Sequence, residues 1–240
     1  MEETTTSVGH PEEPSGSSGN EHSGWAVIRT GTQTVAVEAM LPAAIKKTDW
    51  RTALPILQAG GVTLRELRLS DAATLLEMLS TEEVARFISP PPTTVEGFER
   101  FSSWTHRERV AGRYICFGVV PDGFDHAIGI IQVRALGANF DIAEWGFVVG
   151  SSFWGTGVFQ CAARQMLAFA FSEVGIERLE ARSVVANGRG NSALQKLGAT
   201  REGTLRKSFL RNGTYHDQVI WSICSDDWRE WQHAAAVRPN

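Results

Sequence analysis

Apolar side chains divide this chain of 240 residues into a polar opening segment and a long patterned body. The opening segment has Met1 and Val8 as its only apolar side chains, so we expect it to be disordered. The next segment has one short alternation, at Val35 and Val37, which is compatible with a strand but does not establish one. The expected organisation has four parts. A disordered acidic tail (1–24) is followed by a lead-in segment of uncertain structure (25–60), a folded domain (61–232) and a C-terminal tail (233–240).

Seven stretches of the body have the two-residue alternation or the short apolar runs that are typical of strands. They cover residues 62–67, 114–120, 127–133, 141–149, 179–185, 201–210 and 215–224. The last two flank Arg211-Asn212-Gly213, and an Asn-Gly pair favours the tight turn of a hairpin. Pro121-Asp122-Gly123 supplies turn chemistry between the second and third stretches.

Helical spacing appears between these strands. Three helix starts are expected early in the body, from N-cap residues and from pairs with the spacing of a capping box. The start signals are, in chain order, Ser70 alone, Ser80 with Glu83, and Thr93 with Glu96. The helices that the two pairs open are expected to end near Ile88 and near Val110, on either side of a rigid proline loop.

Two later helices are expected over residues 158–173 and 191–197, the second ended by Gly198 at a C-terminal glycine position. The order of elements is therefore strand, helices, three antiparallel strands, helix, strand, helix and two strands. This order predicts an α/β domain with a mixed, largely antiparallel central sheet and flanking helices.

Composition excludes several classes of protein. Residues 1–24 hold five glutamates and no lysine or arginine, so the net charge of −4 leaves about +1 on the rest of the chain. A nearly neutral body gives no electrostatic reason to bind nucleic acid, and no apolar run approaches the ~20 residues of a membrane span. The chain's start lacks the basic and apolar regions of a secretory signal. We therefore expect a cytoplasmic protein without nucleic-acid or membrane partners.

The three cysteines are odd in number and far apart, which argues against a disulfide framework and against a zinc site. No histidine spacing suggests a metal, so we expect none. Cys161 falls in the first turn of an expected helix, where a thiolate would be stabilised, but no histidine lies near it in sequence. A buried core cysteine is the preferred interpretation.

The most informative local motif is Trp154-Gly155-Thr156-Gly157, between an apolar strand and a helix start. Glycines let backbone N–H groups approach a ligand closely, and a helix N-terminus adds partial positive charge, so the motif has the makings of an anion cradle. It lacks the lysine of the nucleotide phosphate loop and the third glycine of the dinucleotide fingerprint. A turn that needs glycine only for its geometry is the alternative.

The body resembles the GNAT superfamily of acyl-CoA-dependent N-acetyltransferases, and within it the RimJ/RimL branch of ribosomal-protein alanine N-acetyltransferases. Four stretches in the same order carry the resemblance over roughly residues 62–231. They are Thr63-Leu64-Arg65-Glu66-Leu67 with Asp71-Ala72; Ala143-Glu144-Trp145-Gly146-Phe147 with Trp154-Gly155-Thr156-Gly157; Asn187 through Lys196-Leu197-Gly198-Ala199 to Glu202-Gly203; and Arg206 through Gly213 to Asp217 and Trp228.

The resemblance implies an acetyl-CoA site, and the residues suit one. The pyrophosphate matches N–H groups at the helix start, and the amide-bearing arm can pair with a strand edge if the strand ending at Val149 splays from the one at Leu179. Cofactor contacts are expected from Phe147, Val148, Val149, Trp154, Gly155, Thr156, Gly157, Val158, Asn187 and Asn191. The bulky Phe159, where the family commonly has Gly or Ala, must point away from the cofactor.

Glu144, on the expected cofactor strand, is the candidate general base, acting through water. The alternative is a structural carboxylate paired with Arg134 or Arg182. Backbone N–H groups near Val148 are candidates to polarise the thioester carbonyl. Many family members have a tyrosine as the acid that protonates the leaving thiolate. Leu194 stands at that position here, so no residue is assigned to this role.

The acceptor side is less defined. Phe87 is a candidate for a substrate-side wall, with a plain surface loop as the alternative, and Trp104 is a candidate contact, with a core position as the alternative. A serine commonly opens the short helix of the family; here Gly190 stands there, and Asn191 with Ser192 is expected to take over the cap.

The function that these features predict is direct transfer of acetyl from acetyl-CoA to a primary amine, either a protein N-terminal α-amine or a small-molecule amine. No activated nucleophile is visible, which favours direct transfer over a covalent intermediate. A non-catalytic acyl-CoA-binding regulatory module is the alternative. The protein is expected to be a monomer or a homodimer.

Overall fold

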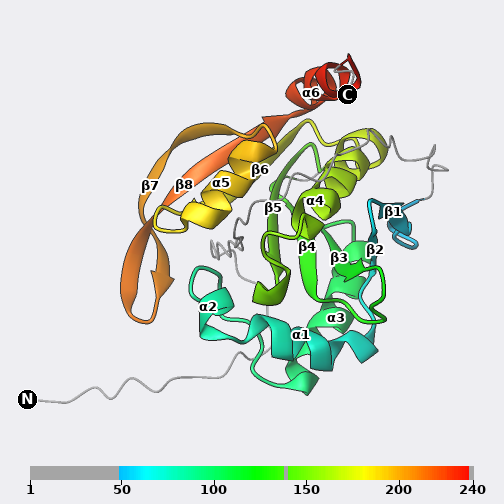
Figure 1. The fold of residues 1–240 in the computed structure, drawn as a ribbon, viewed down its shortest axis with the longest axis vertical. Coiled ribbons are helices and arrows are strands. Elements are labelled where there is room, and N and C mark those ends of the chain that lie inside the picture. Colours follow the sequence, from blue (N-terminus) through cyan, green and yellow to red (C-terminus); the bar gives the residue numbers. More distant parts are fainter. Residues whose placement is uncertain (1–48, 138–139, 238–240) are drawn as a thin grey trace, which may run out of the picture.

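The computed structural model describes residues 49–137 and 140–237, with side chains as far as residue 232 (Figure 1). Eight strands form one sheet in the order β1-β2-β3-β4-β5-β6-β8-β7. The strands are β1 (Leu57–Ala59), β2 (Val62–Glu66), β3 (Tyr114–Pro121), β4 (Gly129–Ala135), β5 (Ile142–Val149), β6 (Arg178–Val184), β7 (Thr200–Arg211) and β8 (Thr214–Cys224). Only β5 and β6 run parallel, which confirms the mixed, largely antiparallel sheet.

The described helices are α1 (Ala72–Leu79), α2 (Glu82–Ala85), α3 (Val95–Val110), α4 (Val158–Phe169), α5 (Gly188–Lys196) and α6 (Ser225–Val237). Two 3-10 turns (Leu69–Asp71 and Ser151–Phe153) precede α1 and α4, and a π-helical turn (Ala170–Val174) ends α4. The described end of the expected lead-in, from residue 49, joins the fold, because β1 pairs with β2 before the boundary drawn at residue 61. Helix α6 likewise runs beyond residue 232. Val35, Val37 and the expected tail of residues 1–24 lie outside the described residues.

Helices cover both faces of the sheet, and aromatic contacts identify which helix lies on which face. On one face Phe117 of β3 packs edge-to-face on Phe169 of α4, and Phe147 of β5 stacks on Phe159 with ring centres 4.1 Å apart. On the other face Tyr114 of β3 packs against Trp104 of α3. Because side chains alternate along a strand, odd-numbered positions of β3 and β5 face α4, and even-numbered positions face the opposite side, where α3 covers β3.

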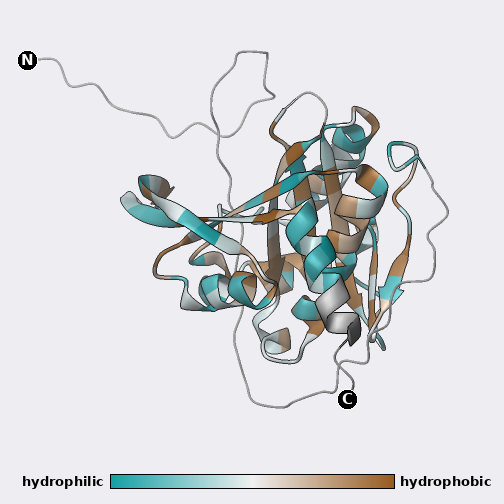
Figure 2. Cartoon of the chain, turned by 90° about the horizontal axis from the view of Figure 1, so that it is seen from above, coloured by the Kyte–Doolittle hydropathy of each residue, from teal (hydrophilic) through white to brown (hydrophobic). Residues whose placement is uncertain are grey.

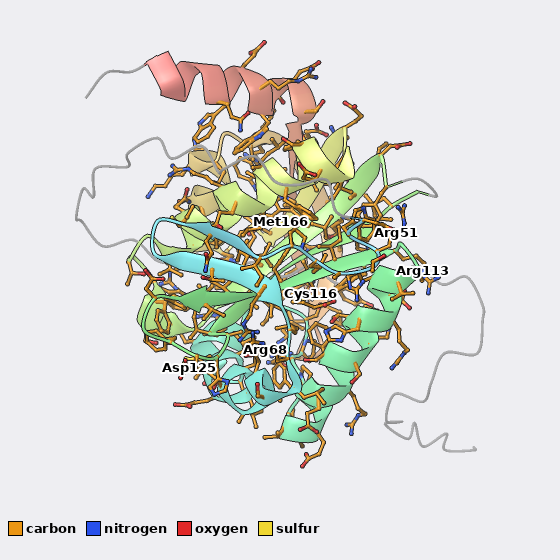
Figure 3. All side chains as sticks on the ribbon, turned by 90° about the vertical axis from the view of Figure 1, so that its right-hand side faces the viewer. Arg51, Arg68, Arg113, Cys116, Asp125 and Met166 are labelled. Atoms are coloured by element: carbon orange, nitrogen blue, oxygen red, sulfur yellow. The ribbon has the colours of Figure 1, made fainter. Side chains whose placement is uncertain are left out.

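The hydrophobic core lies on both faces of the sheet, beneath the helices that cover it. Strand β3 is buried along its whole length, as expected of a central strand covered on both faces. Figure 2 shows apolar residues recurring along the strands, while the helices carry both apolar and polar positions. In Figure 3 Cys116 of β3 and Met166 of α4 lie in the interior, and burial raises the pKa of the Cys116 thiol well above its ordinary value.

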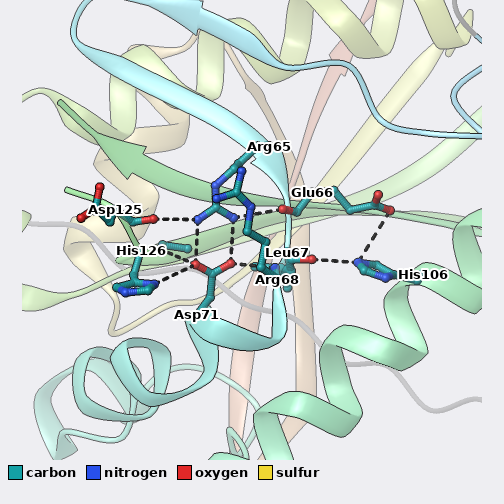
Figure 4. A network of polar contacts seen from close by, with 9 residues as sticks. Arg65, Glu66, Leu67, Arg68, Asp71, His106, Asp125 and His126 are labelled. Atoms are coloured by element: carbon teal, nitrogen blue, oxygen red, sulfur yellow. Dashed lines mark hydrogen bonds and ion pairs between the residues drawn. The ribbon is translucent and has the colours of Figure 1, made fainter. Parts of the chain in front are cut away.

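A buried ion pair between Arg65 and Asp71 stabilises the turn that leads into α1 (Figure 4). Asp71 has no solvent contact, and its two oxygens lie 2.8 and 2.7 Å from the guanidinium nitrogens of Arg65. It also accepts the backbone N–H groups of Arg68 and Ala127. Burial alone would raise the pKa of this carboxyl, but the hydrogen bonds from Arg65, Arg68 and Ala127 outweigh burial and lower the pKa below its ordinary value.

Three of the expected helix caps were wrong by one or more residues. The carboxylate of Asp71, not Ser70, receives a backbone N–H at the turn before α1. Ser80 ends α1 instead of opening α2, whose N-cap is Thr81, and α2 ends at Ala85 rather than near Ile88. Thr94, not Thr93, caps α3 by accepting the N–H of Gly97. In each case neighbouring Ser, Thr and Asp side chains compete, and the chain path decides among them.

Other expected ends were confirmed. Helix α3 ends at Val110, and Gly198 has φ +85 just after α5. Asn212 and Gly213 both have positive φ, at 49 and 73, which makes the two-residue hairpin turn between β7 and β8.

Candidate active site

The parallel strands β5 and β6 pair over only three positions, Ile142–Glu144 with Arg178–Glu180. Beyond Glu144 the register between them ends, while β5 stays paired with β4 as far as Val149. The expected splay between these strands is therefore present. Along the edge of β5 beyond Trp145, the backbone groups on the β6 side have no partner strand.

The β4–β5 ladder shows which backbone groups point into this gap. Gly150 donates its N–H to Ile128, and Leu136 donates to the carbonyl of Ile142. Hydrogen-bonded and non-hydrogen-bonded pairs alternate in an antiparallel ladder. The N–H and the carbonyl of Val148 therefore both point toward Ile130 on β4. The N–H groups that point toward β6 thus belong to Phe147 and Val149, not to Val148.

A glycine turn lies at the open end of the gap. Gly155 and Gly157 have φ +80 and +88, and Val158 starts α4. A Cβ atom at Gly157 would meet no heavy atom within 4 Å, so its positive φ, not crowding, is what requires glycine there. The first N–H groups of an α-helix have no acceptors within the helix. In α4 the N–H of Val158 donates to the Thr156 hydroxyl at 3.5 Å, which leaves those of Phe159 and Gln160 as donors for an anion. The turn is therefore a candidate anion cradle.

Trp154 is part of the framework of this turn. Its indole N–H donates to the carbonyl of Val149 at 3.0 Å, and its side chain is buried. The guanidinium of Arg189, in the first turn of α5, stacks 3.9 Å above the indole ring. Phe159 is buried against Phe147 and does not intrude on the turn, as expected. The sequence analysis did not single out Arg189, since nothing local connects it with a turn some 35 residues earlier.

Asn187 and Asn191 stand at the open end of β6. The side chain of Asn187 caps α5 by accepting the N–H of Gly190, which corrects the expectation that Asn191 or Ser192 opens this helix. A Cβ at Gly190 would lie 2.5 Å from Nδ2 of Asn187, so the serine of the family cannot be accommodated in this arrangement. Asn191 donates to the carbonyls of Val184 and Asn187 and accepts from the indole of Trp221, so its amide links β6, α5 and β8.

Glu144 lies on the face of β5 opposite α4, with 5% of its surface exposed. Its Oε2 is 2.6 Å from Nη2 of Arg134, and its Oε1 is 3.9 Å from Nε of Arg182. Both arginines that the sequence named as structural partners are thus beside it. Oε1 is buried without a hydrogen bond, as are Nε and Nη1 of Arg182. One oxygen of Glu144 therefore remains able to accept a proton or a water molecule.

A small cavity of about 10 Å³, the size of one water molecule, adjoins Glu144. Tyr114 and Gln132 line it, and the Tyr114 hydroxyl donates to the Gln132 side chain. Burial raises the pKa of Tyr114 well above its ordinary value, so the hydroxyl keeps its proton. The sequence did not indicate these neighbours, because the Tyr114–Arg134–Glu144 alignment depends on the registers of two ladders. Leu194, at the family's tyrosine position, is fully buried.

Cys161 packs against the β1–β2 turn, with its sulfur 3.6 and 3.5 Å from the carbonyl oxygens of Ala59 and Gly60. Burial raises the pKa of this thiol despite the helix N-terminus and the nearby Arg164. A thiol in this state is a poor nucleophile, in agreement with a structural role.

A groove of about 450 Å³ lies between α2 with its following turn and the tip of the β7–β8 hairpin (Figure 1). Its lining includes Glu82, Arg86, Phe87, Ala186, Arg211 and His216. Phe87, the candidate for a substrate-side wall, lines this groove. Trp104 does not line it: this indole stacks on Phe101 and packs against Tyr114.

The groove and Glu144 lie on the same side of the sheet. Gly150, the residue after β5, lies six positions from Glu144 and so faces the same side of the sheet. It packs against Met78 of α1, since a Cβ there would lie 2.7 Å from the Met78 sulfur. Helix α1, which leads into α2, therefore covers the face that carries Glu144. Ala186 connects the groove to Asn187 at the open end of the gap.

Within residues 49–137 and 140–237, no group of three His, Cys, Asp or Glu side chains could hold a metal ion. None of the helices in these ranges is both long and apolar enough to cross a membrane.

Comparison with known proteins agrees with this geometry. Residues 62–200 match the family model described as acetyltransferase (GNAT) domain. The uncharacterized N-acetyltransferase YoaA of Bacillus subtilis (strain 168) is 27% identical over 175 residues, covering 70% of this chain and 96% of YoaA. The solved structures that share the fold include proteins of Vibrio fischeri and Mycobacterium smegmatis. The ribosomal-protein-S5-alanine acetyltransferase of Vibrio fischeri has a TM-score of 0.66 at 20% identity, covering 72% of this chain and 98% of that one. Mycobacterium smegmatis RimJ, solved in complex with CoA-disulfide, has a TM-score of 0.64 at 22% identity, covering 74% and 90%.

Proposed function

This chain belongs to the GNAT family of N-acetyltransferases, and we propose that it binds acetyl-CoA between β5 and β6 and transfers the acetyl group directly to a primary amine. The observation that carries the proposal is the parting of the two parallel strands after Glu144, with a glycine turn and a helix N-terminus at the open end. No other part of the described chain combines an unpaired strand edge with an anion cradle.

The residues in the gap fit acetyl-CoA. The N–H groups of Phe147 and Val149 can pair with the amides of the pantetheine arm, as an added strand would. The turn from Trp154 to Val158 can hold the pyrophosphate, since open space adjoins Gly157. Asn187 stands across the gap at the end of β6. When bound, acetyl-CoA supplies the thioester from which the acetyl group is transferred.

Glu144 is our candidate for the residue that prepares the amine. A lysine-like amine costs about 4–5 kcal/mol to deprotonate at pH 7, and an α-amino group costs about 1 kcal/mol. Oε1 of Glu144 has no hydrogen-bond partner and adjoins the water-sized cavity, so it can accept that proton through one water. Arg134 and Arg182 hold the carboxylate in place. The small cost for an α-amine, together with the S5-alanine acetyltransferase among the fold neighbours, favours a protein or peptide N-terminus as acceptor.

Direct transfer is consistent with the state of Cys161, which is the cysteine nearest the turn and is not activated. The alternative of a non-catalytic acyl-CoA-binding module rested on Leu194 at the tyrosine position. We do not adopt it, because the family model and the relatives are those of N-acetyltransferases.

The test is release of CoA from acetyl-CoA with a panel of peptides and small amines, followed by mass measurement of the acceptor. Acetylation of an amine with stoichiometric CoA release is expected. Binding of acetyl-CoA without transfer to any amine of the panel would instead support the regulatory module.

A further inference from the structure

We propose that the acceptor carries an anionic group near its amine, and that Arg211 and Arg86 bind this group in the groove between α2 and the hairpin. This inference rests on the proposed function and narrows its substrate class. The groove is lined from two sides by guanidinium groups, with Arg86 at the end of α2 and Arg211 at the end of β7. The two residues lie 125 positions apart in sequence, so only the tertiary fold brings them to one groove.

Neither arginine takes part in an ion pair in the part of the chain that the structure describes. Arg86 is exposed, whereas Arg211 is half-buried, and most other buried or half-buried arginines there do form ion pairs. The Arg86 guanidinium stacks over the ring of Phe87 at 5.1 Å, which orients it without neutralising its charge. Glu82 is the only acid among the residues that line the groove, so the lining has a net positive charge.

Arg211 gives a more specific indication of anion binding than Arg86 does. Its Nε is shielded from solvent and has no hydrogen-bond partner. A buried donor of a charged group is normally satisfied, and an acceptor placed by a ligand would satisfy this one. Carboxylate and phosphate oxygens match the planar guanidinium best, because they can accept two parallel N–H groups. His216, on the facing strand, adds a further donor or cation at the same end of the groove.

The position of the groove fits an acceptor that is held at one end and reacts at the other. Ala186 forms part of its wall, directly before Asn187 at the open end of the gap. An anion bound at Arg211 would thus leave the amine directed toward the side of the sheet that carries Glu144. The anionic group would hold the acceptor in one orientation, and its amine would remain free to receive the acetyl group.

The experiment compares acceptors that differ only by an anion. The pairs are L-alanine with L-alaninamide, Ala-Asp-Gly-amide with Ala-Asn-Gly-amide, and O-phosphoethanolamine with ethanolamine. We expect the anionic member of at least one pair to have a KM about 10- to 100-fold lower, as for one charged hydrogen-bonded contact. The pair that shows the difference separates carboxylate from phosphate.

Arg211→Met should remove most of that difference, and Arg86→Met part of it, with the KM for acetyl-CoA unchanged. Arg206→Met is the matched control, since this exposed arginine lies on the same strand but does not line the groove. Thermal unfolding of each variant shows whether the hairpin is intact. Equal KM values within all pairs, or a preference that survives Arg211→Met and Arg86→Met, would overturn the proposal while leaving the acetyltransferase in place. Absence of CoA release with every amine would contradict the proposed function as well.

Discussion

Glu144 and Arg134 face each other directly across the β4–β5 ladder, with Oε2 of the glutamate 2.6 Å from Nη2 of the arginine. The contact holds one oxygen of a nearly buried carboxylate and leaves the other without a hydrogen bond. That second oxygen lies 3.9 Å from Nε of Arg182, which is too far for a hydrogen bond. The proposed catalytic role of Glu144 rests on this unsatisfied oxygen.

The first prediction concerns Glu144→Gln, which preserves size but removes the base. Turnover should fall by roughly 10²-fold at neutral pH and recover as pH rises, because free amine then forms without the enzyme. Steady-state rates between pH 6 and 10 measure this. Glu180→Gln is the matched control, since Glu180 is the neighbour of Glu144 in register on β6 and pairs with Arg178. A Glu144→Gln enzyme as active as the parent at pH 7 would show that the carboxylate only supports the fold.

The glycine turn leads to the second prediction. Acetyl-CoA at 100-fold over its Kd should stabilise the parent by about 2.7 kcal/mol, and Gly157→Val should lose most of that effect. Gly123→Val is the control: Gly123 has φ +84 and equally open surroundings but lies in the β3–β4 turn. Both variants carry the same backbone strain, and only the Gly157 variant should lose the cofactor-induced shift in Tm. Equal shifts in the two variants would contradict the assignment of the turn.

The third prediction follows from the lowered pKa of Asp71. Stability from this carboxylate is complete above its ordinary pKa of 3.8 and is lost as pH falls from there through the lowered value. Asp71→Asn should lower the free energy of unfolding by roughly 3–5 kcal/mol at pH 7, since it leaves Arg65 buried without its partner. The variant should also show a weaker loss of stability below pH 4, measured by denaturant unfolding. Glu108→Gln, which breaks the exposed pair with Arg113, should cost at most about 1 kcal/mol. An unchanged acid dependence in Asp71→Asn would refute the role assigned to this group.

The fourth prediction is that Cys161→Ala keeps its turnover. Burial raises the pKa of this thiol, so it should also react slowly with iodoacetamide at pH 7 in the folded protein. Labelling followed by mass measurement, compared with labelling in denaturant, tests the second statement. Loss of turnover in a stable Cys161→Ala protein would indicate an acetyl-cysteine intermediate and rule out direct transfer.

The sequence by itself determined those features that depend on the conformation of one or two residues. Gly155 and Gly157 at the cofactor turn and the Asn212-Gly213 hairpin were identified because positive φ is a property of the residue type. Seven of the eight described strands were identified because alternation and apolar runs record burial directly, whereas the short β1 was not. These local signals, in the correct order, were enough to establish the family and the fold class.

Only the tertiary structure decided which side chains meet. The cap of each helix depended on the choice between adjacent candidates, as at Asp71, Thr94 and Asn187. The direction of the Val148 backbone groups depended on ladder register, which no short window of sequence specifies. Strands β3 to β7 separate Arg86 from Arg211 in the chain, and only the folded sheet brings both residues to one groove. Such contacts form between residues that are far apart in the sequence. The type of a residue limits its own backbone conformation, but it does not determine which distant residue packs against it.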